Sequence, residues 1–286
     1  MDNFKLDFIG IGGQRCGTTW VSECLRDHPE ICFSKDKETH FFTLRNHLGF
    51  DWLKSNFNHC ESDGIKGEFT TDYFEDISTA DKIRETFPEA KIIACVRNPI
   101  KRTFSHYLYR KRKAGYPKKL SQVIEKDYKK IIENSLYGKH FVPFLEKFPK
   151  ENVLVLVHDE SFEDPLAYIQ KIYKFLGVDE SFVPQSLYED INRSKNQKHW
   201  FPPLEWLAAY RMTFTSSSFG KIFTPLLKSL KIHKFLDILR GLNRRSGSHK
   251  EQEFISSGDE EQLTKIFEKD IKVFESYLGR RINIWH

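Results

Sequence analysis

Three short apolar runs, each followed by a stretch with helical spacing, divide the first two thirds of the chain. The runs are LDFIGI at residues 6–11, KIIACV at residues 91–96 and NVLVLV at residues 152–157. Continuous apolar runs of this length are typical of parallel strands that helices cover on both faces. Strands that alternate with helices predict an α/β fold with a central parallel sheet flanked by helices.

Capping residues mark where the helices begin and end. A helix is expected over residues 18–26, a second from Pro99 behind the capping Asn98, and a third over residues 165–176, where a glycine follows. Residues 259–278 carry apolar side chains at helical spacing, which predicts a packing helix. No internal repeat interrupts this pattern.

The length and the position of these elements favour one domain over residues 1–286. Residues 202–252 do not continue the alternation of strands and helices, and we interpret them as a variable helical insertion. Within them, residues 221–245 are rich in lysine and arginine and also carry leucines and phenylalanines at helical spacing.

Composition excludes several classes of protein. With 286 residues, 30% of them charged, the chain has no apolar run near the roughly 18 residues that a membrane span needs. The first residues lack the pattern of a secretory signal, and the five cysteines are odd in number and never spaced as CxxC. We therefore expect a cytoplasmic protein with neither a disulfide framework nor a zinc site.

The net charge of +5 favours an acidic ligand. No recognised nucleic-acid-binding module is present, so nucleic acid is not an expected partner.

The stretch GGQRCGTT at residues 12–19, called here the glycine loop, has the G-x-x-x-x-G frame of a phosphate-binding loop that opens a helix. Thr18 stands where nucleoside triphosphatases carry the lysine that reaches the β and γ phosphates. Arg15 lies inside the turn instead. The loop therefore suits a donor that is shorter and less charged than a triphosphate with its magnesium ion, although glycines also make tight turns without any ligand.

Two motifs in this order resemble the sulfotransferases that use 3′-phosphoadenosine-5′-phosphosulfate (PAPS). The first reads Arg15-Cys16-Gly17-Thr18-Thr19, followed by a helix and by His28-Pro29; the second reads Arg97-Asn98-Pro99, with Ser105 eight residues after the arginine. Further segments resemble the glycosaminoglycan-type enzymes and related bacterial ones. They are KETHFF at residues 37–42, SLY at residues 135–137 and GRRINIWH at residues 279–286.

The resemblance implies a P-loop-like sulfotransferase fold, PAPS as sulfuryl donor, adenosine 3′,5′-bisphosphate (PAP) as product, and no metal. It implies donor-binding roles for Arg15, Cys16, Gly17, Thr18, Thr19, Arg97, Ser105 and Lys195. Two positions depart from the family pattern. Arg15 replaces a lysine, which keeps the charge but changes its geometry, and Phe69 replaces a lysine that follows Glu68.

Glu38 and His40 are the candidate catalytic pair. If residues 38–42 are extended, both side chains point to the same side of the chain. Glu38 is then the general base for an acceptor hydroxyl, while His40 orients it and Arg15 stabilises the charge that develops. The alternative for Glu38 is a solvated carboxylate in a charged loop. Glu68 is the reserve base, and Tyr137 either approaches the acceptor or packs in the core.

These observations favour sulfuryl transfer to a small-molecule or oligosaccharide hydroxyl, with a carbohydrate as the preferred acceptor. A P-loop-type kinase or nucleoside triphosphatase is the alternative enzyme. A non-catalytic protein that docks on a polyanion or a membrane through residues 221–245 is the alternative outside enzymology.

Overall fold

The computed structural model describes residues 4–60, 64–114, 119–126, 131–188, 197–199, 244–246 and 253–286. Lys195 and most of the interpreted insertion, including residues 221–243 of the basic segment, lie outside the described residues. Within the insertion, a short strand β7, Arg244–Ser246, pairs antiparallel with β6, Gln197–His199.

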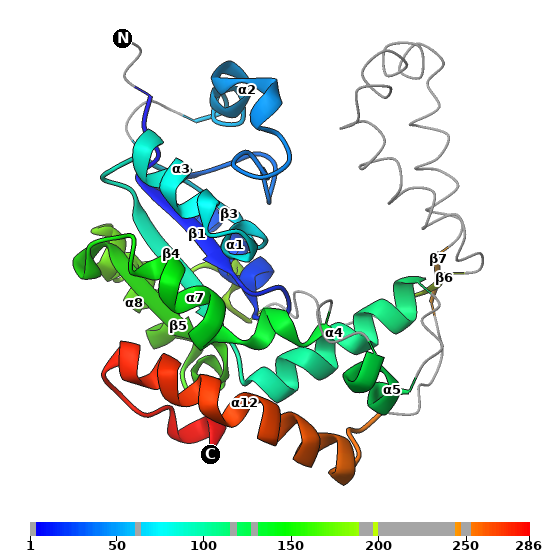
Figure 1. The fold of residues 1–286 in the computed structure, drawn as a ribbon. Helices are drawn as coiled ribbons and strands as arrows, with labels where there is room; N and C mark the ends of the chain where they lie inside the picture. Colours follow the sequence, from blue (N-terminus) through cyan, green and yellow to red (C-terminus); the bar gives the residue numbers. More distant parts are fainter. Residues whose placement is uncertain are drawn as a thin grey trace.

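Five parallel strands form the central sheet, in the spatial order β2-β3-β1-β4-β5 (Figure 1). Their bounds are Phe8–Gly12 for β1, Ile31–Phe33 for β2, Ile65–Thr70 for β3, Lys91–Val96 for β4 and Val153–Val157 for β5. The three strands predicted from apolar runs are thus confirmed as β1, β4 and β5, which lie side by side. Strands β2 and β3, which the hydrophobic pattern did not predict, extend the sheet on the other side of β1.

The α-helices connect and cover these strands. Their bounds are Thr18–Asp27 for α1, Phe50–Ser55 for α2, Ser78–Thr86 for α3, Pro99–Ala114 for α4, Leu120–Lys126 for α5, Tyr137–Leu145 for α7, Pro165–Leu176 for α8 and Ser257–Leu278 for α12. The predicted caps are confirmed. The Asp164 carboxylate accepts a hydrogen bond from the Ala167 amide at the start of α8, and Gly177 ends that helix at a φ of 82°.

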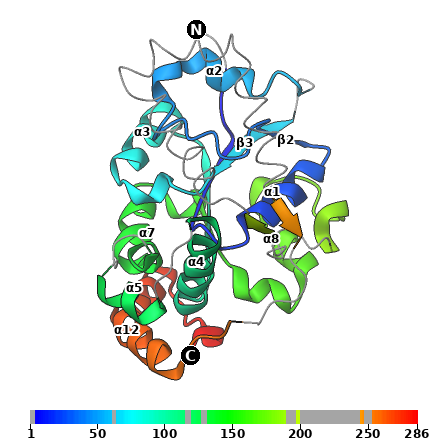
Figure 2. The same ribbon diagram turned by 90° about the vertical axis from the view of Figure 1, so that its right-hand side faces the viewer.

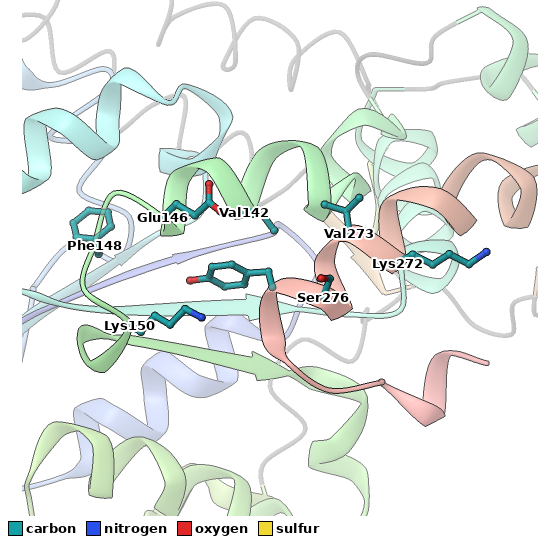
Figure 3. Close-up of a pocket in the computed structure, with 8 residues that line it drawn as sticks. Val142, Glu146, Phe148, Lys150, Lys272, Val273 and Ser276 are labelled. Carbon is teal, nitrogen blue, oxygen red and sulfur yellow. The ribbon is translucent and has the colours of Figure 1, made fainter.

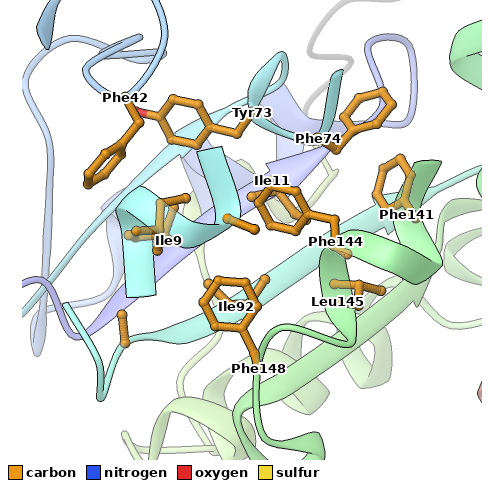
Figure 4. Packing of buried hydrophobic residues seen from close by; sticks show 14 of the residues in the cluster. Ile9, Ile11, Phe42, Tyr73, Phe74, Ile92, Phe141, Phe144, Leu145 and Phe148 are labelled. Carbon is orange, nitrogen blue, oxygen red and sulfur yellow. The ribbon is translucent and has the colours of Figure 1, made fainter. Parts of the chain in front are cut away.

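Neighbouring residues of the central strands point to opposite faces of the sheet. In β4, Ile92 and Ala94 join a core with α3, α7 and α12, whereas Ile93 and Cys95 join a second core with α1 and α8. Figure 4 shows the first core, where Phe141 and Phe144 of α7 pack over the strands. Burial on both faces explains why β4 is a continuous apolar run.

The long helices α4 and α12 build a third apolar cluster beside the sheet. Its buried members include Tyr107 of α4, Val123 of α5 and Leu263 and Phe267 of α12, and Figure 2 shows α4, α5 and α12 gathered below the sheet. Farther along α12, Phe274 packs in the first core. The expectation of a packing helix over residues 259–278 is therefore confirmed.

Parallel strands end at one edge of the sheet, and this edge positions the candidate site. The glycine loop follows β1, Thr71 and Asp72 follow β3, Arg97 follows β4 and His158 follows β5. The hydrogen bond between the Gly13 amide and the Cys95 carbonyl, 3.0 Å long, fixes the start of the loop against β4.

The cysteine pattern was read incorrectly at one point. Cys32 of β2 and Cys60, which follows α2, form a disulfide, with 5.7 Å between their Cα atoms. The fold brings Cys32 in β2 next to Cys60, 28 positions later in the chain. The CxxC spacing rule covers only cysteines that are close in sequence, so it could not reveal this pair. Disulfides are typical of oxidising compartments, so the cysteines no longer support the cytoplasmic location that we predicted.

In the described part of the chain, no helix has the length and apolar character needed to cross a bilayer.

Candidate functional site

The glycine loop presents unpaired backbone amides at the start of α1. Gly17 is the N-cap residue with a φ of 79°, a conformation that suits glycine because it has no Cβ. Within the described residues, the amides of Thr18 and Thr19 have no carbonyl partner, as expected for the first turn of a helix. Such amides and the helix dipole together form a site for an anion.

Arg15 is held at the side of this loop. Its Nε donates to the Ser105 hydroxyl over 3.1 Å, and its guanidinium lies 5.2 Å from the centre of the Tyr109 ring. Both partners belong to α4. The Arg15 backbone has a φ of 75°, an uncommon value for a residue with a side chain, which directs Arg15 toward α4. The structure thus brings Arg15 and Ser105, which the motifs assigned separately, into direct contact.

Arg97 approaches the loop from the end of β4. One of its terminal nitrogens donates to the Arg15 carbonyl over 3.4 Å. Its Nε is buried and has no hydrogen-bond partner among the described residues. A buried, unpaired donor on a charged group is costly unless a ligand satisfies it, so this atom fits an anionic ligand beside the loop.

Tyr137 supports Arg97 from the core. Its hydroxyl donates to the Arg97 carbonyl over 2.8 Å and accepts from the Arg97 amide over 3.3 Å. The Tyr137 side chain is 1% exposed, so it packs in the core and does not approach an acceptor. The Cys16 thiol lies 3.8 Å from the same hydroxyl, and burial raises the pKa of Cys16 to about 11. Cys16 therefore offers its backbone rather than a thiolate to any ligand.

A buried arginine that the motifs did not mark lies beneath the loop. Arg102 of α4 is completely buried and donates to the Gln14 carbonyl over 3.0 Å, to the Ile131 carbonyl over 2.9 Å and to His106 Nδ1 over 2.7 Å. Burial and the charge of Arg102 lower the pKa of His106 to about 3, so the ring is a neutral acceptor. Arg102 fixes the backbone of the glycine loop from below.

Positive charge accumulates around Arg15, beside α4. Burial, followed by the charges of Arg112 and Arg97, lowers the pKa of Arg15, although the group remains a cation. In the described residues no carboxylate forms an ion pair with Arg15 or Arg97. Cations that lack acidic partners, together with free helix amides, fit a ligand with two phosphate-type anions.

Glu38 and His40 do lie together, although the reason that we predicted is wrong. The segment is not extended, because Glu38 has a φ of 64° and His40 a φ of 52°. These two left-handed residues turn the chain, and His40 Nε2 lies 3.5 Å from the Glu38 carboxylate. The Glu38 carboxylate also accepts from the Thr71 hydroxyl over 3.1 Å and contacts the Lys37 ammonium at 3.2 Å. The Glu38 side chain is 29% exposed, so its carboxylate has partners and is still open to solvent.

Asp72 is a member of this group that the sequence reading missed. His40 Nδ1 lies 2.9 Å from one Asp72 oxygen. Burial lowers the pKa of His40, but the hydrogen bond to Asp72 and the charges of Asp72 and Glu38 outweigh burial and raise the pKa. The only sequence signal for Asp72 is its place just after a strand, and that strand, β3, was not predicted.

Glu68, the reserve base, lies beneath the turn. It is completely buried, and one of its oxygens accepts from the Thr70 hydroxyl over 2.6 Å. Burial raises its pKa. The Thr39 hydroxyl and the Tyr73 hydroxyl are 3.1 Å apart next to it. Glu68 therefore supports the segment that carries Glu38 rather than facing an acceptor.

Two other features of the described chain resemble ligand sites but do not include the candidate residues. Figure 3 shows a groove between α7 and α12, lined in part by Glu146, Lys150, Lys272 and Tyr277, and no candidate site residue lines it. Cys32, His59 and Cys60 are the one cluster in the described chain that has the spacing of metal ligands. Its two sulfur atoms are joined in the disulfide. Lys195, the remaining predicted contact, lies outside the described residues.

Known proteins resemble this chain in sequence and in fold. The model of the sulfotransferase domain family matches residues 5–201. Heparan sulfate glucosamine 3-O-sulfotransferase 3B1 from Mus musculus is 27% identical over 213 residues, which are 69% of this chain and 51% of the relative. Membrane-associated sulfotransferase kil1 from Dictyostelium discoideum is 32% identical over 104 residues, which are 35% of this chain and 22% of the relative.

The fold also has a solved counterpart. The crystal structure of a sulfotransferase from Alicyclobacillus acidocaldarius superimposes with a TM-score of 0.70 at 20% identity, covering 99% of both chains. This chain spans about half the length of the first heparan sulfate relatives that it matches. Because the family model covers more than half of the chain, the chain belongs to the sulfotransferase domain family.

Proposed function

We propose that this protein transfers a sulfuryl group from PAPS to an acceptor hydroxyl, with a carbohydrate as the acceptor class. The observation that supports this most strongly is the buried Nε of Arg97, which has no partner in the described residues next to a loop of free amides. A donor with phosphates at both the 3′ and the 5′ positions would occupy both features.

Different residues around the glycine loop would bind the two ends of the donor's phosphate groups, the 5′-phosphosulfate and the 3′-phosphate. The amides of Thr18 and Thr19, with Arg15, would bind the 5′-phosphosulfate, and Arg97 and Ser105 the 3′-phosphate. PAPS supplies the sulfuryl group when bound. The sulfuryl group carries less charge than a phosphoryl group, so fixed cations can stabilise its transfer and we expect no requirement for a metal.

Glu38 would act as the general base. It takes the proton of the acceptor hydroxyl while the hydroxyl oxygen bonds to sulfur and the bond from sulfur to the bridging oxygen breaks. The electron pair of the broken bond stays on the 5′-phosphate, where Arg15 and the loop amides balance the charge. Asp72 holds His40, and His40 Nε2 lies 3.5 Å from the Glu38 carboxylate, where it would orient that carboxylate toward the acceptor.

The acceptor class rests on the relatives, several of which carry heparan sulfate glucosamine in their names. The chain spans about half the length of these relatives. We also propose that the basic residues 221–245 attract an anionic acceptor. The cytoplasmic location stays a prediction, which the disulfide between Cys32 and Cys60 does not favour.

Binding of nucleotides tests the donor assignment. We expect PAP to bind at least ten times more tightly than adenosine 5′-monophosphate in calorimetry, because the 3′-phosphate adds charged hydrogen bonds of about 1.5 to 3 kcal/mol. A chelator of magnesium should leave both affinities unchanged. Equal affinities, or tighter binding of ATP that needs magnesium, would replace the proposal with the kinase or nucleoside triphosphatase alternative.

A further inference from the structure

His158 lies against the glycine loop without having been marked by any motif. It follows β5 directly and begins the short 3₁₀-helix at His158–Phe162. A Cβ atom placed on Gly17 would come within 2.5 Å of His158 Nδ1 and within 2.6 Å of its Cε1. The imidazole ring therefore borders the N-cap of α1, beside the amides of Thr18 and Thr19.

The ring lies among one apolar, one polar and two charged side chains. Phe162 packs 5.2 Å from it, and the Ser161 hydroxyl lies 3.4 Å from Nδ1. Arg97 and Asp159 are the charged groups that act on it. The Asp159 carboxylate accepts from the Asn98 amide over 2.6 Å and lies 3.6 Å from the Lys101 ammonium, which offsets part of its charge.

These surroundings keep the ring neutral in the protein alone. Burial and the charge of Arg97 lower the pKa of His158 to about 4, while Asp159 opposes the shift. A phosphate bound at the loop would cancel the effect of Arg97 and add negative charge next to the ring. Both changes favour the protonated imidazole.

We propose that His158 is a donor-binding residue that takes up a proton when the nucleotide binds and then contacts an anionic oxygen of its phosphate. This inference rests on the proposed function, because it assumes a nucleotide phosphate at the glycine loop. Depending on the pH, up to one proton passes from solvent to the imidazole for each nucleotide bound, and the N–H bond is the only covalent bond that forms. Donor affinity should therefore fall as the pH rises through the pKa of His158 in the complex.

Calorimetry with PAP tests the proposal. Titrations from pH 5.5 to 8.5, in pairs of buffers with different ionisation enthalpies, count the protons taken up on binding. Near pH 6, we expect wild type to take up at least about half a proton more per PAP bound than the His158→Gln variant. At that pH it should bind PAP about 5 to 10 times more weakly, and the difference should shrink toward pH 8.5.

A matched control is His140→Gln, which changes a half-buried histidine of α7 whose acidic partner is Glu133. It should match wild type in affinity and proton count. The titration of PAP itself is common to all three proteins and cancels in the comparison. If His158→Gln unfolds, NMR titration of the His158 Cε1 proton in wild type gives the same answer, since its pKa should be higher in the PAP complex.

The outcomes separate the two proposals. Equal proton counts in wild type and His158→Gln at every pH, or an unchanged His158 pKa in the complex, would overturn the role of His158 even if PAP binds tightly. Wild type that binds PAP no better than adenosine 5′-monophosphate would instead contradict the proposed donor.

Discussion

Two of the candidate catalytic residues contact partners that follow another strand. Glu38 and His40 belong to the segment after β2, whereas Thr71 and Asp72, which bond to them, follow β3. The left-handed backbone of Glu38 and His40 is maintained by the hydrogen bond from the Glu38 amide to the Phe69 carbonyl, 3.0 Å long. Such strained residues are typical of functional sites, which is a reason to test them singly.

Replacement of the base gives the most direct test at this scale. We expect Glu38→Gln to lower turnover with PAPS and a carbohydrate acceptor by about 10² to 10⁴, the range for loss of a positioned general base, with PAP affinity unchanged. Glu85→Gln, at an exposed position of α3, is the control and should keep full turnover. Near-normal turnover of Glu38→Gln would move the base elsewhere, and Glu68→Gln would be measured next.

The pair of His40 and Asp72 should make stability depend on pH. The pKa of His40 is raised in the folded protein above its ordinary 6.5, so the pair stabilises fully below about pH 6.5 and less as the pH rises through the folded pKa. We expect Asp72→Asn to lower the free energy of unfolding by about 1.5 to 3 kcal/mol near pH 6 and by less at pH 9.

Urea unfolding between pH 5.5 and 9 measures this difference. Asp51→Asn, at a fully exposed side chain, is the control and should shift stability equally at every pH. A loss for Asp72→Asn that does not change with pH would show that His40 does not carry the charge assigned to it.

At the scale of elements, the edge strand β2 and the segment after it are tied by the disulfide. The closed loop between Cys32 and Cys60 has a sequence separation of 28 and contains both Glu38 and His40. Strand β2 has only three residues and pairs with β3 alone, so ladder hydrogen bonds hold it less firmly than the central strands. The covalent bond therefore matters more here than it would in the middle of the sheet.

We expect Cys60→Ser to lower the free energy of unfolding by about 3 to 4 kcal/mol under oxidising conditions, the chain-entropy cost of a loop of this length. The difference from wild type should vanish once a thiol reductant has opened the disulfide in wild type, and alkylation with mass spectrometry verifies its state. Equal stability of the two oxidised proteins would mean that Cys32 and Cys60 are not paired in solution.

At the scale of the whole molecule, the candidate site depends on all five strands of the sheet. The two cores on its faces share the central strands, and α12 links the first core to the cluster with α4 and α5. A ligand at the common edge of the strands should therefore stabilise the molecule as a unit.

We expect PAP at 100 times its dissociation constant to raise the free energy of unfolding by about 2.7 kcal/mol, as mass action requires for a ligand that binds only the folded protein. Urea unfolding curves recorded by tryptophan fluorescence and by circular dichroism should coincide, and PAP should shift both to higher urea by the same amount. Two transitions, only one of which PAP shifts, would mean that part of the chain unfolds independently of the site.

The sequence by itself determined the features that depend on neighbours along the chain. The runs that became β1, β4 and β5, the caps of α8 and the frame of the glycine loop follow from local spacing, because burial on two faces and the start of a helix leave local patterns. Glu38 and His40 were found through a motif, although their backbone turns where an extended segment was expected.

Tertiary structure alone decided the rest. Asp72 meets His40 across 32 positions, Cys32 meets Cys60 across 28, and His158 reaches Gly17 from a different strand. These pairs depend on the order of the strands in the sheet, and β2 and β3 are too short or too polar to be recognised from their pattern. A parallel sheet joins residues at the ends of its strands whatever their separation, so the partners of the site could be named only once the order of the strands was known.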